Sequence, residues 1–199
     1  KEYNLIYSKE YTFDSHYDDP NQEERKEPND PLGSYDSLDR LVKYKDYTYI
    51  YDALDRRISK TRGPLLSYQD EHFLYDGLEE IASYNNSFNP QAVKIGPPAR
   101  PSFLLLHNSL TVPLYDVQGS LKYITDIKTE TIHNSYSFDS FGNSVEVIET
   151  LPNPWRYALK HYDPESELIY FGKRYYNPIT KQWITEDPAG DIDTLNLYA

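Results

Sequence analysis

The segment Tyr51-Asp52-Ala53-Leu54-Asp55-Arg56-Arg57-Ile58 decides the fold, because its pattern returns elsewhere along the chain. The pattern is an aromatic residue, Asp, two spacers, a turn-forming residue, a polar residue and usually an aliphatic one. Its other copies begin at Tyr35-Asp36, Tyr75-Asp76, Tyr115-Asp116 and Phe138-Asp139. A phrase repeated in this way predicts a repeat architecture, in which similar units stack on their neighbours.

Each phrase predicts a β-hairpin. Tyr47, Tyr49 and Tyr51 fall on one face of an extended segment and Thr48 and Ile50 on the other, an alternation typical of a strand. Asp starts turns by bonding the backbone two residues on, and Gly or Asp tolerates a left-handed conformation. The residues at the turn position are Asp39, Asp55, Glu79, Gly119 and Gly142.

Because one hairpin is marginal in water, these units must pack side by side. We therefore predict an all-β protein: tandem antiparallel hairpins in a curved strip, with little helix. The aromatic residues that open the phrases should pack from strand to strand and be mostly buried.

Three parts are predicted along the chain. Residues 1–72 hold degenerate repeats with an acidic loop near 18–30, residues 73–150 hold clearer repeats, and residues 151–199 form a C-terminal region. Asn89-Pro90 and the proline-rich run 96–101 predict a loop over 88–102, since neither fits the interior of a paired strand. Phe103–Leu106 should follow as a fully buried strand.

Composition excludes several classes of function. The net charge of −12 argues against binding a nucleic-acid backbone, and no apolar run is long enough to span a membrane. Cysteine is absent, the five histidines are scattered, and the carboxylates near 18–30 match no calcium loop. We therefore expect no metal site and no cofactor.

Three C-terminal segments resemble the last part of an RHS (YD-repeat) protein and its associated core region. They are Tyr115-Asp116-Val117-Gln118-Gly119-Ser120-Leu121 with its continuation to Asp126, Tyr136-Ser137-Phe138-Asp139-Ser140-Phe141-Gly142-Asn143, and the longer run of motifs from Tyr162 to Ala199. The resemblance covers about 125 residues and extends more weakly toward residue 30.

The resemblance implies a fold and a function. In this family a long β-sheet strip winds into a hollow shell that encloses a toxic C-terminal segment, as in Tc toxin complexes and polymorphic RHS toxins, and more distantly in teneurins. Residues 151–199 would be the start of a plug that closes one end. The implied partners are the rest of the RHS polypeptide or a separate shell subunit, and the enclosed toxin segment. The implied location is secreted or cell-surface, although this sequence shows no signal peptide.

Some family members also cut the toxin free as aspartic autoproteases. By resemblance, Asp187 is the first carboxylate of the required pair, and Arg174 matches an important arginine. Two carboxylates that share a proton supply an acid and a base toward water. The competing interpretation is structural, with Asp187-Pro188-Ala189-Gly190 as a turn and Arg174 paired to it across a hairpin.

The sequence departs from the family pattern at two places. Ala199 comes before the family's second Asp-Pro-x-Gly motif and cleavage point, and Asp191 and Asp193 do not match its spacing, so we expect at most an incomplete autoprotease. Acidic residues also replace the turn glycine at Asp39, Asp55 and Glu79, and Glu80 replaces the following arginine. Because Glu fits a left-handed turn poorly, we expect a distorted third hairpin.

An alternative function is an extracellular adhesion or carbohydrate-binding module. Trp155 and Trp183 could then stack on sugars, although tryptophans in a shell wall are more often part of the core. Loss of glycan binding in Trp155→Ala or Trp183→Ala, with folding intact, would favour this alternative.

Overall fold

The computed structural model describes residues 33–63 and 70–187. These residues form two antiparallel sheets, which confirms the predicted all-β class. The acidic segment near 18–30, Asp191 and Asp193 lie outside the described residues.

The larger sheet has 12 strands, and each strand pairs with the next along the chain. The strands are β1 (Gly33–Tyr35), β2 (Leu41–Tyr44), β3 (Tyr47–Tyr51), β4 (Arg57–Arg62), β5 (Glu71–Asp76), β6 (Glu79–Asn85), β7 (Pro90–Ile95), β8 (Phe103–Leu106), β9 (Ser109–Tyr115), β10 (Leu121–Asp126), β11 (Ile132–Phe138) and β12 (Ser144–Glu149).

The smaller sheet has four strands in sequence order. They are β13 (His161–Asp163), β14 (Leu168–Tyr170), β15 (Tyr175–Asn177) and β16 (Gln182–Trp183), and the 3₁₀ helix η2 (Tyr157–Leu159) leads into them. None of the helices in 33–63 and 70–187 has the length and apolarity needed to cross a bilayer.

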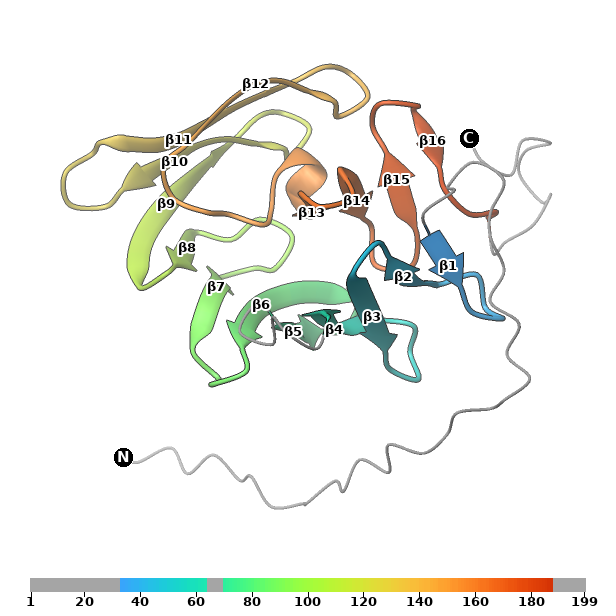
Figure 1. Ribbon diagram of the computed structural model, residues 1–199. Coiled ribbons are helices and arrows are strands. Elements are labelled where there is room, and N and C mark those ends of the chain that lie inside the picture. The colour runs from blue at the N-terminus through green and yellow to red at the C-terminus, as the bar shows by residue number, and fades with distance from the viewer. Residues whose placement is uncertain (1–32, 64–69, 188–199) are drawn as a thin grey trace.

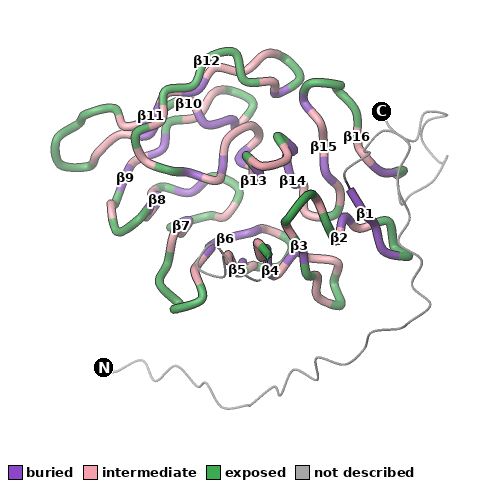
Figure 2. Tube along the Cα trace, in the orientation of Figure 1, coloured by how far each residue is buried: buried purple, intermediate pink, exposed green. Residues whose placement is uncertain are grey.

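The larger sheet curves around the smaller one, which lies on its concave side (Figure 1). Buried residues lie within the strands of both sheets, and exposed residues gather in the loops that connect them (Figure 2). Buried hydrophobic residues form two clusters, one between the larger sheet and the segment that leads into the smaller sheet, and one between the two sheets. One cluster includes Leu104, Ile124 and Trp155, and the other includes Tyr49 and Tyr170. The segment that follows the repeats therefore lies inside the curve of the larger sheet, β1–β12, which we call the wall.

In four of the five phrases the turn is built by the Asp. Asp52 Oδ1 accepts the N–H groups of Leu54 at 2.9 Å and Arg56 at 3.0 Å, while Asp55 takes the left-handed conformation at φ 63°. The aspartates of the first, fourth and fifth phrases accept the same pair of N–H groups: Asp36, Asp116 and Asp139. An Asp at the fifth position thus replaces glycine without changing the turn.

The third hairpin uses a different turn. Asp76 pairs with Glu79, so only Gly77 and Leu78 connect the strands, and the positive φ of 59° falls on Gly77. A two-residue turn with a positive φ at its first residue alone is of type II′. Glu79 is therefore the first residue of β6 and does not occupy a left-handed position, so the expected distortion at Glu79 is absent.

The opening aromatic residues connect successive hairpins. Tyr35 is fully buried and the other four are half-buried. The Tyr51 hydroxyl donates to the Leu41 carbonyl at 2.7 Å, and the Tyr75 hydroxyl donates to the Arg57 carbonyl at 2.8 Å. Each of these tyrosines thus binds the strand that follows the preceding turn, which buries the ring and satisfies its hydroxyl.

Two expectations about residues 88–106 need correction. Pro90–Ile95 forms β7, so the predicted loop shrinks to the turn at 86–89 and the connection at 96–102. Pro90 is the first residue of its strand, where a missing N–H is tolerated. The segment Phe103–Leu106 is a strand but is not fully buried: Leu104 and Leu106 face the core, and the alternate residues are half-exposed.

Gly119 and Gly142 occupy the same turn position, but only one has a close neighbour. A Cβ at Gly119, φ 85°, would meet nothing within 4 Å, whereas a Cβ at Gly142, φ 82°, would lie 2.5 Å from Tyr157 Cδ1. We expect Gly119→Ala to cost about 1 kcal/mol, from backbone strain alone. Gly142→Ala should cost about 2–4 kcal/mol, since overpacking adds to that strain.

Urea unfolding of the two variants measures this difference. Adding Tyr157→Ala to Gly142→Ala should reduce the cost of the glycine substitution to that at Gly119. Equal costs for the two single variants would contradict the assigned contact with Tyr157.

Candidate functional site

The first candidate site is the pair formed by Arg174 and Asp187. Arg174 precedes β15, Asp187 follows β16, and the pairing of Tyr176 with Trp183 brings the two ends of this hairpin together. Arg174 Nη2 lies 2.6 Å from Asp187 Oδ2, and the guanidinium lies 4.3 Å from the centre of the Trp183 ring. The structure therefore brings together the two residues that the sequence singled out.

A cavity of about 450 Å³ opens beside this pair. Phe171, Lys173 and Trp183 line it from the smaller sheet, and Leu78 and Glu79 line it from the third turn of the wall. Arg174 Nη1 is buried and has no hydrogen-bond partner in the described part of the chain. The guanidinium can thus hold Asp187 through one nitrogen and offer another to a carbonyl or carboxylate in the cavity.

The described lining provides one aspartate for acid–base chemistry, Asp187. The other carboxylate among the lining residues, Glu79, has both oxygens 3.1 Å from Lys160 Nζ. A shared-proton pair requires two carboxylates at hydrogen-bond distance, and Glu79 is instead held by Lys160.

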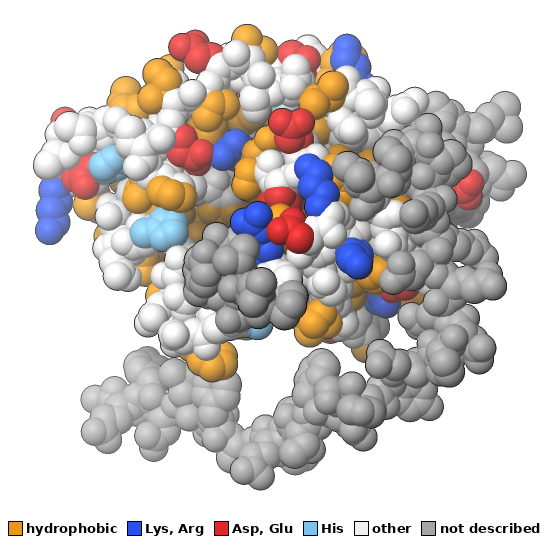
Figure 3. All heavy atoms as spheres, in the orientation of Figure 1, with side chains coloured by type: hydrophobic (Ala, Val, Ile, Leu, Met, Phe, Trp, Pro, Cys, Tyr) orange, Lys and Arg blue, Asp and Glu red, His pale blue; other side chains and the backbone are white. Residues whose placement is uncertain are grey.

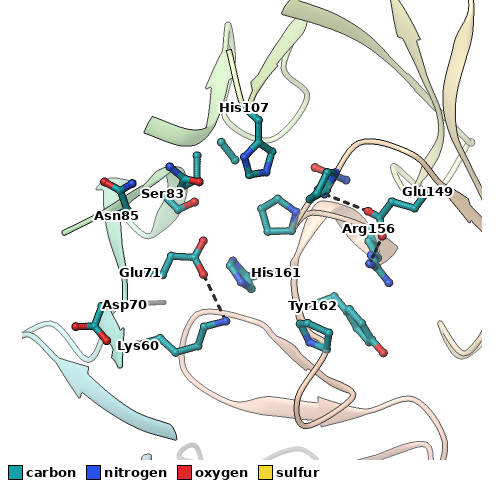
Figure 4. A pocket seen from close by; sticks show the side chains of 16 residues that line it. Lys60, Asp70, Glu71, Ser83, Asn85, His107, Glu149, Arg156, His161 and Tyr162 are labelled. Atoms are coloured by element: carbon teal, nitrogen blue, oxygen red, sulfur yellow. Dashed lines mark hydrogen bonds and ion pairs between the residues drawn. The ribbon is translucent and has the colours of Figure 1, made fainter. Parts of the chain in front are cut away.

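A second cavity of about 470 Å³ lies between the wall and the chain leading into the smaller sheet (Figure 4). Two ion pairs lie in its lining: Lys60 Nζ lies 3.4 Å from Glu71, and Arg156 Nη2 lies 2.6 Å from Glu149. In Figure 4, Lys60 and Glu71 lie on one side of the cavity, and Glu149 and Arg156 lie on the other. The lining therefore combines charged and polar groups with apolar ones.

A buried ion network joins the wall to the smaller sheet. Arg57 of β4 and Asp163 of β13 are both fully buried and form an ion pair, and Lys60 Nζ lies 3.1 Å from the other oxygen of Asp163. Rings from both sheets surround the Arg57 guanidinium, including Phe73 at 4.5 Å and Tyr170 at 4.7 Å. These ring faces offset its loss of water on the sides that carry no hydrogen bond.

This network fixes the ionisation of its members. Burial alone would raise the pKa of Asp163, but the Arg57 and Lys60 cations outweigh burial and hold that pKa below its ordinary value. Burial likewise opposes the charge on Lys60, yet Asp163, Glu71 and Glu165 together hold its pKa above the ordinary value. Asp163 is therefore an anion, and Lys60 a cation, at neutral pH.

Glu80 is the centre of a second buried cluster. Its Oε1 accepts Trp155 Nε1–H at 2.9 Å and lies 2.9 Å from His161 Nδ1. Burial works against ionisation, but His161 and Arg57 prevail and keep the pKa of Glu80 below its ordinary value. Burial also lowers the pKa of Lys94, whose Nζ lies 4.7 Å from the Trp155 ring, to about 8.

Sequence reasoning missed Arg57, Asp163 and Glu80, the residues that hold the wall to the smaller sheet. One signal in the sequence was the Arg56-Arg57 pair. Because adjacent strand residues point to opposite faces, one of two neighbouring arginines has to face the core. Arg56 binds Asp52 at the turn and Arg57 points inward. No local pattern marks Asp163 as its partner.

The two tryptophans have different environments. Trp155 is fully buried, so it offers no face to a sugar, whereas Trp183 is half-buried against Phe171, Tyr176 and Arg174. Among residues 33–63 and 70–187, no group of three or more His, Asp or Glu side chains could hold a metal ion.

Known proteins are similar to this chain, some in sequence and some in fold. The chain is 30% identical over 174 residues to the toxin subunit YenC1 of Yersinia entomophaga, covering 76% of this chain and 18% of YenC1. It is 29% identical over 163 residues to the tRNA nuclease WapA of Bacillus subtilis, covering 76% of this chain and 7% of WapA. No family model matches.

Solved Tc toxin structures contain the same fold. A TcdB2–TccC3–Cdc42 crystal structure superposes with a TM-score of 0.63 at 22% identity, covering 82% of this chain and 9% of that one. A Photorhabdus luminescens Tc holotoxin pore superposes with a TM-score of 0.65 at 22% identity, covering 83% and 9%. The chain is an RHS-type relative of Tc toxin subunits. It spans only a small part of the length of each of these proteins.

Proposed function

We propose that this chain is the terminal wall and plug of a secreted RHS-type toxin, and that its wall encloses a toxic segment of the same polypeptide. The supporting observation is the curved sheet that surrounds later parts of its own chain, with the fully buried Arg57–Asp163 pair between them. A buried charge is strongly destabilising without its partner, so this ion pair ties the later segment to the interior of the wall and not to its surface.

Two further features support enclosure. The cavity inside the wall has a mixed lining in which two ion pairs lie among apolar groups, so the surface offered to an enclosed polypeptide is not continuously apolar. Within residues 33–63 and 70–187, the large sheet also ends at β1 and β12 without closing on itself. The partners are therefore the remainder of the polypeptide or a separate shell subunit, which complete the wall. The net charge of −12 argues against a nucleic-acid partner.

Release of the enclosed segment by self-cleavage is the second function that we propose. The Arg174–Asp187 pair at 2.6 Å, the orphaned Arg174 Nη1 and the adjoining cavity support it. In this role Asp187 acts as acid or base toward water, and Arg174 binds the carbonyl of the bond to be cut. This chemistry also requires a second carboxylate that shares a proton with Asp187.

Mass spectrometry of the natural polypeptide that carries this chain tests self-cleavage, and the same preparations are then used to test enclosure. We expect the unchanged polypeptide to be cut C-terminal to Asp187, and Asp187→Asn to slow this cut about 100-fold or more, the range for loss of a general acid or base. Glu186→Gln is the matched control beside it and should leave the cut unchanged. Equal cutting in Asp187→Asn, or no cut in any form, would refute self-cleavage.

Enclosure is tested by treating the same preparations briefly with trypsin and measuring how much of the C-terminal segment survives. The segment C-terminal to the plug should survive in the native protein and be digested after denaturation. If it is digested as fast as the free segment, the wall does not enclose it, whatever the result for Asp187.

A further inference from the structure

The third turn of the wall carries the dipeptide Asp76-Gly77. In an Asp-Gly dipeptide the glycine nitrogen can attack the side-chain carboxyl group of the aspartate with little steric hindrance, because glycine has no Cβ beside the attacking nitrogen. In the other four phrases the residue after the aspartate is Ser, Ala, Val and Ser. The third turn is therefore the phrase in which such an attack meets the least hindrance.

The aspartates of the other four phrases are held by their turns. Each accepts two backbone N–H groups, from the residues two and four positions ahead, as Asp52 does from Leu54 and Arg56. The Oδ2 atom of Asp52 also accepts Arg56 Nε–H at 2.7 Å. Attack by the following nitrogen requires the side chain and the main chain of the aspartate to rotate toward each other, so these hydrogen bonds must first break.

The Asp76 side chain has different surroundings. Acidic side chains of this chain often lie beside basic ones, as at the centre of the face shown in Figure 3. Asp76, in contrast, forms no side-chain hydrogen bond or ion pair with any of the described residues. It is exposed, together with Gly77 and Leu78 beside it. Its carboxyl group is therefore free to rotate toward the Gly77 nitrogen.

The length of the turn explains this difference. Tyr75 pairs with Glu80, five residues ahead, whereas Tyr51 pairs with Arg57, six residues ahead. The third turn is thus one residue shorter, and the residue four positions after Asp76 already takes part in strand pairing. Its N–H group therefore does not bind the Asp76 carboxyl group.

We propose that Asp76 isomerises spontaneously to isoaspartate, and that the turn hydrogen bonds protect the other four aspartates from the same reaction. The Gly77 nitrogen attacks Cγ of the protonated Asp76 carboxyl group, and the carboxyl OH leaves with the amide hydrogen as water. The product is a five-membered succinimide ring. A second water molecule opens this ring, and opening at the main-chain carbonyl of Asp76 leaves the chain running through Cβ and Cγ. One water leaves and one enters, so the composition does not change.

The rearrangement adds one main-chain carbon to a two-residue turn. The Gly77 carbonyl accepts Arg56 Nη1–H at 2.7 Å, a bond that ties the second turn to the third. Leu78 and Glu79, the next two residues, line the cavity of about 450 Å³ from the side of the wall. Isomerisation therefore changes the wall side of this cavity, and it takes place whether or not the chain encloses a segment or cuts itself.

Incubation of the folded chain at neutral pH tests the proposal, with Ala53→Gly as a matched comparison. This substitution places an Asp-Gly dipeptide at Asp52, where the turn hydrogen bonds hold the carboxylate. Ala53 is exposed, so the variant keeps the fold, which circular dichroism checks. Isoaspartate is measured by methyl transfer from radiolabelled S-adenosylmethionine with protein isoaspartate methyltransferase, and it is located by electron-transfer mass spectrometry of peptides. In the folded variant we expect at least about tenfold less isoaspartate at Asp52 than at Asp76, because two hydrogen bonds must first break at Asp52.

The same incubation in urea separates the effect of the fold from that of the sequence. In urea the two dipeptides should convert at equal rates, because the turns are lost. Equal conversion of the two dipeptides in the folded variant, an unequal conversion that persists in urea, or a folded wild-type chain that forms no isoaspartate at Asp76 would overturn the proposal.

Discussion

Replacement of Asp163 by alanine should lower the free energy of unfolding by about 3–5 kcal/mol, the cost of leaving a buried charge without its partner. Arg57 would lose its ion-pair partner while remaining fully buried, and Lys60 would lose one of its carboxylates. Urea unfolding at pH 7 measures the change. Asp46→Ala is the matched control, since its pair with Arg62 lies at the surface, where solvent screens it, and its loss should move the urea midpoint far less than Asp163→Ala does.

Acid unfolding gives a second measure of how much the Asp163 carboxylate contributes to the free energy of unfolding. The pKa of Asp163 is lower in the folded protein than the value of about 3.9 expected when unfolded, so the unfolded state takes up the proton first as pH falls. Its contribution is therefore complete above about pH 4 and is lost as pH falls further, toward the folded pKa. Stability of Asp163→Ala should fall less steeply below pH 4. Equal urea midpoints, or equal acid slopes, would contradict the role of Asp163.

The hairpins could be predicted from sequence because their causes are local. Asp52 binds N–H groups two and four residues ahead, and Tyr51 binds a carbonyl on the adjacent strand. A repeated phrase therefore reveals each turn and the order of the strands. The third turn was missed because Gly77 offered a tighter reversal two residues earlier than the pattern placed it.

The contact between the larger and the smaller sheet could not be predicted in this way. Arg57 and Asp163 are 106 residues apart in the chain, and neither stands in a pattern that identifies the other. The curvature of the sheet brings them together, and curvature depends on how all the strands twist and pack. The Arg174–Asp187 pair was within reach of sequence reasoning because a single hairpin joins its two residues. The cavity beside this pair could not be predicted, since residues of the third turn of the larger sheet line its opposite side.

Glu80 shows how a departure from the repeat pattern acquires a structural role. The resemblance leads one to expect arginine after the turn, as at Arg40 and Arg56, where it binds the turn aspartate. The two-residue third turn moves position 80 into β6, with its side chain toward the core. A carboxylate there can accept from Trp155 and pair with His161, which arginine cannot do.

We therefore expect Glu80→Ala to lower the free energy of unfolding by about 3–5 kcal/mol, because Trp155 Nε1–H loses its acceptor and the buried His161 its carboxylate. Glu80→Gln should cost less, since its carbonyl still accepts from Trp155 while the charge is lost. Glu79→Ala, next in the chain, removes only a partly exposed pair with Lys160 and should cost under about 1 kcal/mol.

Fluorescence separates a local effect from general unfolding. In a Trp183→Phe background the emission comes from Trp155, which is fully buried. Glu80→Ala should shift this emission to longer wavelength before the main urea transition, because the indole loses its fixed partner and water enters beside it. If Glu80→Ala and Glu79→Ala unfold at the same urea concentration with unchanged emission, Glu80 does not hold Trp155 to the wall.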